Sequence, residues 1–346
     1  MRKKVLVPAL LTVLICGYFI WRFANAGREV QADDVRVGWQ TAWATQGQII
    51  QAMAHTNIPT LYESHPIFLA FQYGPDLNEA AITGNIDVTN SGIVPTINLI
   101  AKDPDWVIVG RVVDFPIAIV SRESSIRTLE DLRGHSFAVP TGGGSHPFAL
   151  QSLRDHGLSV GDGPGQVKVV NIKPTEMAIA MSQKKVDAAA IWEPIRTALL
   201  EQGGNVVAET RYVGFITVNR SFARRYPGRV SDLLKSYIEA NLYVAKHRDQ
   251  TDTWFAEASN MDKSLIQKIK VIEPNLQAKG INDISIGVSD GDISLAQSVA
   301  ARMREAGLIG RLPRMADYID MSYLKRSQSE LTMSGHKTAR VSVTKN

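Results

Sequence analysis

Short apolar runs and amphipathic stretches alternate through the first third of the chain, in the order expected for strands separated by helices. The runs that predict strands are 35–39, 67–73, 86–89, 106–113 and 116–121. The stretches that predict helices are 44–54, 75–83 and 94–102. Because helices connect the first strands, we expect a mostly parallel sheet covered by helices on both faces.

The same alternation restarts after residue 122 and then changes to helices. The second set of predicted strands is 136–139, 167–172 and 188–192, with further strands in 206–218. From residue 221 onwards the pattern is almost entirely helical. The simplest arrangement packs these helices on the first α/β unit. The chain would then cross twice between the two units, near 120–123 and near 215–219, and these crossings would form a hinge. The predicted lobes are 35–121 with 217–325, and 122–216.

The chain begins with a targeting segment at residues 1–26. Three basic residues, Arg2 to Lys4, precede an apolar run at 5–21, and Ala24-Asn25-Ala26 follows as a small-residue cleavage site. This pattern predicts export with a cleaved signal peptide, and an uncleaved membrane anchor is the alternative. Cys16, the single cysteine, lies inside this segment. The mature chain is therefore expected to have no disulfide, thiolate nucleophile or thiolate metal site.

The net charge of +4 conceals an acidic body between two basic ends. Residues 1–26 and 325–346 each carry a net +4, which leaves −4 for residues 27–324. An acidic body without a lysine and arginine cluster argues against nucleic-acid binding, which depends on neutralising phosphates. The polar end at 326–346 is predicted to be disordered.

Several segments resemble one protein family when they are taken together in chain order. They are 35–40, 81–87 (Ala-Ile-Thr-Gly-Asn-Ile-Asp), 90–95, 126–134 (ending Asp-Leu-Arg-Gly), 141–145, 186–194 (ending Trp-Glu-Pro) and 305–309. In this order the chain resembles the periplasmic substrate-binding proteins of ABC importers, in the taurine, alkanesulfonate and nitrate branch. The resemblance covers about 35–325.

The resemblance implies a type II periplasmic-binding-protein fold, with two α/β lobes, a ligand cleft and a two-crossing hinge. It implies a monomeric receptor without a cofactor, located in the periplasm or tethered to the inner membrane. Such a receptor delivers a small organic anion to a permease driven by an ATPase, and the preferred ligand is an organosulfonate such as taurine or an alkanesulfonate. Alternative interpretations are a receptor for nitrate, bicarbonate or a thiamine pyrimidine precursor, an anchored sensor domain, and an enzyme. Two enzymes of this fold depend on cysteines, which this chain lacks beyond Cys16.

Ligands of open α/β sheets bind outside the carboxyl ends of strands. Four strand-to-helix loops in this chain offer hydroxyls, backbone N–H groups at helix starts or aromatic walls there. The candidate ligand-binding residues in these loops are Gln40, Thr41, Trp43, Ser91, Gly92, Thr141, Gly143, Gly144, Ser145, His146, Trp192 and Glu193.

Each candidate also has an ordinary structural interpretation. Trp43 and Trp192 are equally consistent with partly buried core, and Glu193 with a solvated hinge acid. Arg111 and Asp114 are expected to form an ion pair beneath the cleft, although Asp114 could face the ligand. No arginine is placed unambiguously to clamp an anion. The histidines lack metal-ligand spacing, so no metal site and no catalytic residue are predicted.

Overall fold

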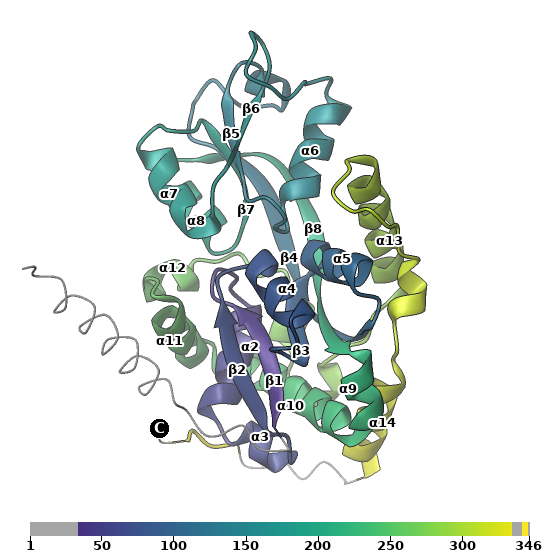
Figure 1. Cartoon of the computed structure of the whole chain (residues 1–346). Coiled ribbons are helices and arrows are strands. Elements are labelled where there is room, and N and C mark those ends of the chain that lie inside the picture. The colour runs from purple at the N-terminus through teal and green to yellow at the C-terminus, as the bar shows by residue number, and fades with distance from the viewer. Residues whose placement is uncertain (1–33, 334–340, 345–346) are drawn as a thin grey trace, which may run out of the picture. The chain divides into compact units, whose positions relative to one another are not determined.

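A mixed sheet of eight strands organises the chain in the computed structural model, which describes residues 34–333 and 341–344 (Figure 1). The predicted leader at 1–26, with Cys16, lies outside these residues. The strand order is β2-β1-β3-β8-β4-β7-β5-β6. Across the described ranges, no helix combines the length and the apolar character that a membrane span requires.

The first three strands form the lower part of the sheet in Figure 1, the lower half-sheet. Strand β1 (Val35–Gln40) pairs in parallel with β2 (Pro66–Phe71) on one side and with β3 (Val88–Gly92) on the other. Helices α2 (Gln46–His55) and α4 (Gly74–Ile82) make the connections between these strands. This is the parallel arrangement predicted from the alternating pattern.

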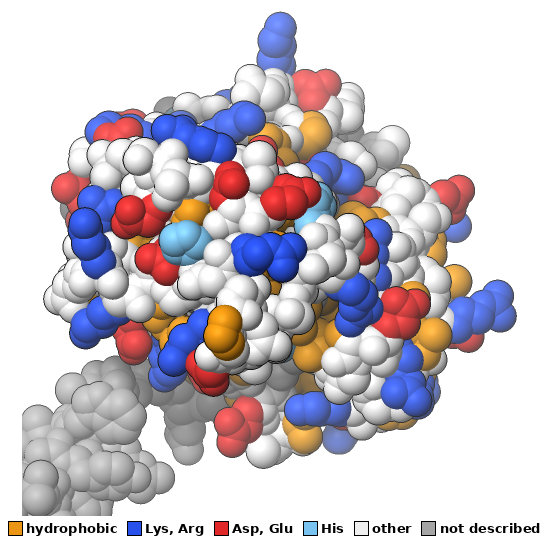
Figure 2. All heavy atoms as spheres, turned by 90° about the horizontal axis from the view of Figure 1, so that it is seen from above, with side chains coloured by type: hydrophobic (Ala, Val, Ile, Leu, Met, Phe, Trp, Pro, Cys, Tyr) orange, Lys and Arg blue, Asp and Glu red, His pale blue; other side chains and the backbone are white. Residues whose placement is uncertain are grey.

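The second set of parallel strands forms the upper half-sheet of Figure 1. Strand β5 (Ser136–Val139) pairs in parallel with β6 (Lys168–Asn171) and with β7 (Ala188–Trp192). Helices α6 (His146–Asp155) and α7 (Pro174–Ser182) connect them. Figure 2, which views the molecule from above, shows basic and acidic side chains interspersed on this face, without a field of one sign.

Two long antiparallel strands, β4 (Trp106–Ser121) and β8 (Asn205–Asn219), join the half-sheets. Strand β8 pairs with β3 and β4 pairs with β7, so each long strand belongs to both parts. The predicted two-crossing hinge is confirmed: the chain passes between the half-sheets within β4 and β8, whereas the predicted positions 120–123 and 215–219 lie at the ends of these strands. A register shift between Arg111 and Asp114 explains why the apolar pattern reads as two strands there.

The helices that cover the lower half-sheet form two packed groups. Helix α5 (Ile93–Lys102) contacts α4 and α13 (Asp290–Glu305), whereas α10 (Pro227–Lys246) contacts α2 and α11 (Arg248–Ser259). The other helices are α3 (Ile58–Leu61), α8 (Ile195–Glu201), α9 (Arg220–Arg225), α12 (Lys263–Gln267), α14 (Ser322–Met333) and short 3₁₀ turns.

Strand β4 lies in the centre of the hydrophobic core, and all of its residues are buried. A strand covered on both faces needs a continuous apolar sequence, which 106–121 provides apart from Arg111, Asp114 and Ser121. A second, smaller apolar cluster fills the upper half-sheet around Phe137 and Leu153. The boundaries predicted for the two lobes stay a prediction.

The C-terminal end departs from the predicted disorder at 326–346. Helix α14 continues to Met333, and the Ser327 hydroxyl, which is buried, donates to the Ser231 carbonyl at 2.9 Å. Further on, Val343 forms an antiparallel bridge with Thr56. The prediction is therefore wrong for 326–333 and 341–344, because anchors far away in the sequence hold these residues. Residues 334–340 and 345–346 lie outside the described part.

Candidate functional site

The carboxyl ends of strands from both half-sheets meet directly. The Trp192 Nε1–H group, at the end of β7, donates to the Ala42 carbonyl at 2.9 Å. The Ala44 N–H group donates to the Glu193 carbonyl at 3.3 Å. On the outer side, Gln72 Nε2 donates to the Thr175 hydroxyl at 2.8 Å. These contacts bring the predicted loops of the two half-sheets together.

Gln46, which the sequence analysis missed, shapes the loop after β1. Its buried amide accepts from the Gln40 N–H group at 3.0 Å and donates to the carbonyls of Gln40 and Trp43 at 3.3 and 3.4 Å. The loop also holds Thr45 at φ 63°, a rare conformation for a residue with a side chain. The position of a glutamine at the first residue of the helix that follows β1 was the available indication of this role.

Gln40 and Thr41 direct their side chains into the protein. Gln40 Nε2 donates to the Asn90 carbonyl at 3.1 Å, and the Thr41 hydroxyl donates to the Phe71 carbonyl at 3.3 Å. Both bonds connect the end of β1 to a neighbouring strand. These two side chains therefore fix the loop, and their predicted contact with a ligand stays a prediction.

Both predicted aromatic walls are buried. Trp43 is 3% exposed and packs on Phe115, with ring centroids 4.7 Å apart. A Cβ atom at Gly214 would lie 2.4 Å from the Trp43 ring, so only glycine leaves room for this tryptophan. Trp192 is 4% exposed and lies against Gly143 and Gly144. The two rings thus lie on opposite sides of the contact between the loop after β1 and the end of β7.

The glycine-rich loop before α6 brings backbone close to Trp192. Gly142 has a φ of 74°, which favours glycine, and a Cβ atom at Gly143 would lie 3.0 Å from the Pro140 carbonyl. The buried Ser145 hydroxyl donates to the Ala190 carbonyl at 2.7 Å. Thr141 is exposed, and its N–H group donates to Asn171 Oδ1 at 2.9 Å.

Ser91 and Gly92 end β3 and begin α5. Ser91 is fully buried, and within the described residues its hydroxyl has no hydrogen-bond partner. Gly92 is the N-cap of α5 and brings no capping side chain. Buried hydroxyls are normally hydrogen-bonded, and the first N–H groups of a helix need external acceptors. An unpaired hydroxyl beside a helix start is suited to an anionic oxygen.

The Glu193 carboxylate is bound within the upper half-sheet. It accepts from the Thr197 N–H group at 3.0 Å, the Thr197 hydroxyl at 2.7 Å and Arg196 Nη1 at 3.2 Å. Burial raises the pKa of Glu193, and the bonds from Thr197 and Arg196 offset part of that rise. This side chain caps the start of α8, and the predicted ligand contact of Glu193 stays a prediction.

Arg111 and Asp114 form the expected ion pair beneath the strand ends, with Nη1 and Oδ1 3.3 Å apart. Arg111 also binds the buried Glu273 in a bidentate manner, at 2.6 and 2.9 Å. Asp114 accepts from Arg211 at 2.7 Å, and Arg211 lies 3.5 Å from Asp292. Carboxylates therefore surround Arg111, which leaves it unsuited to clamp an anionic ligand.

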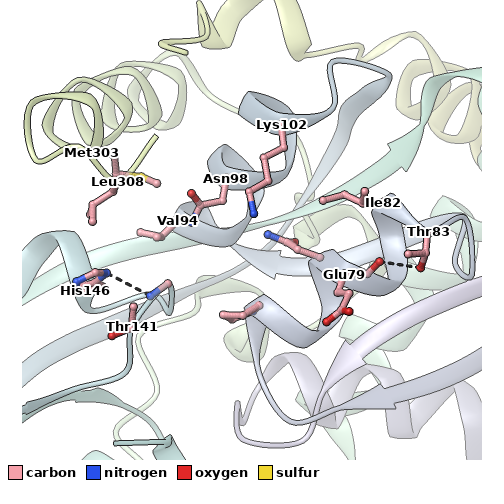
Figure 3. A pocket seen from close by; sticks show the side chains of 13 residues that line it. Glu79, Ile82, Thr83, Val94, Asn98, Lys102, Thr141, His146, Met303 and Leu308 are labelled. Carbon is pink, nitrogen blue, oxygen red and sulfur yellow. Dashed lines mark hydrogen bonds between the residues drawn. The ribbon is translucent and has the colours of Figure 1, made fainter. Parts of the chain in front are cut away.

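His146 begins α6 beside a cavity of about 440 Å³ (Figure 3). The Gly142 N–H group donates to its Nδ1 at 3.2 Å, so the proton of the neutral ring is on Nε2. Burial lowers the pKa of His146 from its ordinary value of 6.5. The ring therefore presents a neutral N–H donor rather than a cation.

This lowered pKa predicts a change in acid stability for His146→Asn. The protonated ring is disfavoured in the fold, so its contribution to stability is present above pH 6.5 and is lost as the pH falls through the lowered pKa. The variant keeps an acceptor for Gly142 but cannot titrate. We expect its unfolding free energy, measured by urea at pH 5–7, to fall less steeply with acid. Equal slopes for the variant and the wild type would contradict the prediction.

The described ranges contain no group of three or more histidine, cysteine, aspartate or glutamate side chains that could hold a metal ion. The candidate site is built instead from hydroxyls, amides, backbone groups and aromatic rings. Such a set is chemically suited to directional hydrogen bonds and apolar contact with a small organic molecule.

Comparisons with known proteins agree with this architecture. A protein of Escherichia coli (strain K12) whose name assigns it to the aliphatic sulfonate-binding proteins is 28% identical over 263 residues, 73% of this chain and 80% of the relative. The crystal structure of the periplasmic aliphatic sulphonate-binding protein from Escherichia coli superposes with a TM-score of 0.68 and 25% identity, covering 84% and 92% of the two chains. The chain has the periplasmic binding protein fold. Residues 119–257 also match the NMT1-like family.

The periplasmic binding protein fold confirms the predicted fold class and the family resemblance. The same fold occurs in a desulfurization enzyme, whose crystal structure superposes with a TM-score of 0.61 at 13% identity. That likeness concerns the fold alone. The sulfonate-binding relatives are named as binding proteins, whereas the fold itself accommodates both binding and catalysis.

Proposed function

We propose that this protein is a receptor for a small organic anion, an organosulfonate of the alkanesulfonate or taurine type, which it binds between its half-sheets. The observation that carries the proposal is the direct hydrogen bonding between the loop that follows β1 and the end of β7, which belong to different half-sheets. A ligand placed there touches both halves at once. The sulfonate-binding names of the relatives support the choice of ligand.

A sulfonate suits the donors at this meeting point. It is a monoanion with three acceptor oxygens, and the site offers the Ser91 hydroxyl and first-turn N–H groups of α5 (Ile93, Val94) and α6 (Phe148). Each helix start contributes about half a positive charge. Because Arg111 is already paired with Glu273, binding relies on hydrogen bonds and helix ends rather than on a guanidinium.

Binding closes the two half-sheets by rotation about β4 and β8. The bonds from Trp192 to Ala42 and from Ala44 to Glu193 belong to this closed arrangement, because each joins the two halves. The ligand stabilises the closed form by contacting both sides. A permease driven by an ATPase then recognises the closed receptor in the periplasm. We propose a monomer, free or tethered through residues 1–26.

A ligand screen tests the proposal. Residues 27–346 are titrated with propane-1-sulfonate, taurine, nitrate, bicarbonate and a thiamine pyrimidine precursor, and thermal unfolding is followed. A ligand at 100 times its Kd stabilises the fold by about 2.7 kcal/mol, so a sulfonate response is expected. A response to nitrate, bicarbonate or the pyrimidine alone would replace the sulfonate assignment.

We propose binding without turnover, and recovery of the ligand tests this point. The resemblance places a cysteine nucleophile in the sulfinate desulfinase of this fold, whereas this chain has only Cys16. After overnight incubation, the sulfonate should be recovered unchanged. Loss of the carbon–sulfur bond would show an enzyme instead.

Replacing Ser91 with alanine is expected to weaken sulfonate binding about tenfold, the effect of losing one hydrogen bond to a charged group. The fold should lose no stability, because the hydroxyl has no protein partner within the described ranges. Thr89→Val is the matched control: Thr89 is two residues earlier on β3, and its hydroxyl is likewise buried without a described partner. Isothermal titration separates the two variants, and an equal loss of affinity in both would contradict the role of Ser91.

A further inference from the structure

The cavity beside His146 adjoins the proposed anion site. Thr141, Gly142 and His146 line one side of it, and Val94, the second residue of α5, lines another. The same helix starts that we propose for the sulfonate therefore border a volume of about 440 Å³. This volume extends along α4 and α5 and is large enough for the remainder of a small ligand (Figure 3).

One exposed cation, Lys102, lines this cavity. Lys102 is the last residue of α5, and among the residues that the structure describes it forms no ion pair. Figure 3 shows its ammonium directed into the cavity beside Asn98, while the carboxylate of Glu79 points away from it. Lys102 is thus available to an anionic group in the cavity.

An unpaired acceptor lies on the neighbouring helix. Asn78 of α4 lines the cavity, is 7% exposed, and donates through Nδ2 to the Pro95 carbonyl at 2.8 Å. Its Oδ1 atom is buried and, across the described part of the chain, accepts no hydrogen bond. Because buried amide oxygens are normally paired, this atom is suited to a hydroxyl of a bound molecule.

The rest of the lining is mostly apolar. Ile82, Val94, Met303 and Leu308 contribute side chains without polar groups. They suit a short carbon chain between two polar ends. One polar end of such a ligand would reach the starts of α5 and α6, and the other end would reach Lys102 and Asn78.

We propose that the cavity holds the tail of the ligand, and that this tail ends in a carboxylate paired with Lys102. A hydroxyl next to the carboxylate donates to Asn78 Oδ1. The substrate class is therefore a sulfonated carboxylic acid of about three carbons, with a hydroxylated form preferred. This inference rests on the proposed function, because it assigns the sulfonate to the strand ends.

The test compares three ligands that differ only in the tail: propane-1-sulfonate, 3-sulfopropionate and 3-sulfolactate. In isothermal titration of the mature exported chain at low salt, 3-sulfopropionate should bind about five- to tenfold tighter than propane-1-sulfonate. 3-Sulfolactate should bind tighter again, by about threefold or more. In Lys102→Met the ratio between the affinities for 3-sulfopropionate and propane-1-sulfonate should fall to about one.

Lys185→Met is the matched control, because it removes an exposed lysine of the upper half-sheet that does not line the cavity. It should keep the wild-type ratio, and thermal unfolding checks that both variants fold. Equal binding of all three ligands by the wild type would overturn the proposal, as would a ratio that survives in Lys102→Met. If propane-1-sulfonate binds and 3-sulfopropionate binds no tighter, the proposed carboxylate tail is wrong but the proposed sulfonate receptor is not. Failure of every sulfonate to bind overturns the proposed function together with it.

Discussion

Replacing Arg111 with methionine is expected to lower the free energy of unfolding by about 3–5 kcal/mol, because it leaves a buried carboxylate without its cation. Glu273 is 1% exposed and accepts both Arg111 bonds, together with the N–H groups of Asp114 and Asn275 at 2.6 and 2.9 Å. Methionine fills a similar volume but provides no donor. The loss therefore reports the uncompensated charge rather than a cavity.

The matched control is Arg36→Met. Arg36 also binds a carboxylate through two nitrogens, Nη2 and Nε, at 2.6 and 2.9 Å from Asp87, but its side chain is 32% exposed. The partly exposed pair is weaker to begin with, and Asp87 keeps the bond from the Arg36 N–H group at 2.9 Å, so we expect a loss of about 1 kcal/mol or less. Urea unfolding at pH 7 measures both variants. Adding Glu273→Gln to Arg111→Met should restore part of the stability, and equal losses in the two single variants would contradict this account.

Replacing Trp192 with phenylalanine is expected to weaken ligand affinity about tenfold, because it destabilises the closed arrangement of the two half-sheets that the ligand requires. The indole N–H group donates to the Ala42 carbonyl across the two half-sheets, and both groups are buried there. Phenylalanine keeps most of the ring but leaves this carbonyl unpaired, at a cost of about 1–3 kcal/mol in the closed form. In an open form water reaches the carbonyl, so the cost falls on closure rather than on folding.

Trp106→Phe is the control for this effect. Trp106 also loses a hydrogen bond, from Nε1 to Asp103 at 3.0 Å, but this bond is local to the start of β4 and does not join the two half-sheets. This variant should lose stability and keep its affinity. Isothermal titration gives the affinities, and small-angle scattering with and without sulfonate reports closure. A Trp192→Phe protein that closes and binds like the wild type would disprove the role of this bond.

Local patterns predicted the elements because each strand and helix here carries its own periodicity. The run at 35–39 became β1, and the stretch at 44–54 became α2 with a shift of one or two residues. The need for glycine at Gly142 was also local, since its φ of 74° is set by the turn. Strand β4 was read as two pieces because a bulge carries Arg111 and Asp114 through the middle of an apolar strand.

Side-chain roles that depend on distant partners could not be predicted. Glu273 is 162 residues from Arg111 in sequence, and nothing near either residue indicates their pairing. Trp43 and Trp192 fitted a ligand wall and a buried core equally well, and the structure buries both rings. The Lys102 cavity was missed for a similar reason, because it is assembled from four separate segments.

The sharing of β4 and β8 by both half-sheets has a consequence for how this protein can be divided. A fragment cut at residues 122 and 216 would lose β4 entirely, and with it one of the two partners of β7 and the partner of most of β8. Neither half is then a module that could be exchanged with that of another receptor by simple recombination. We expect one cooperative melting transition for the whole body, and chimeras that work only when both long strands come from the same parent.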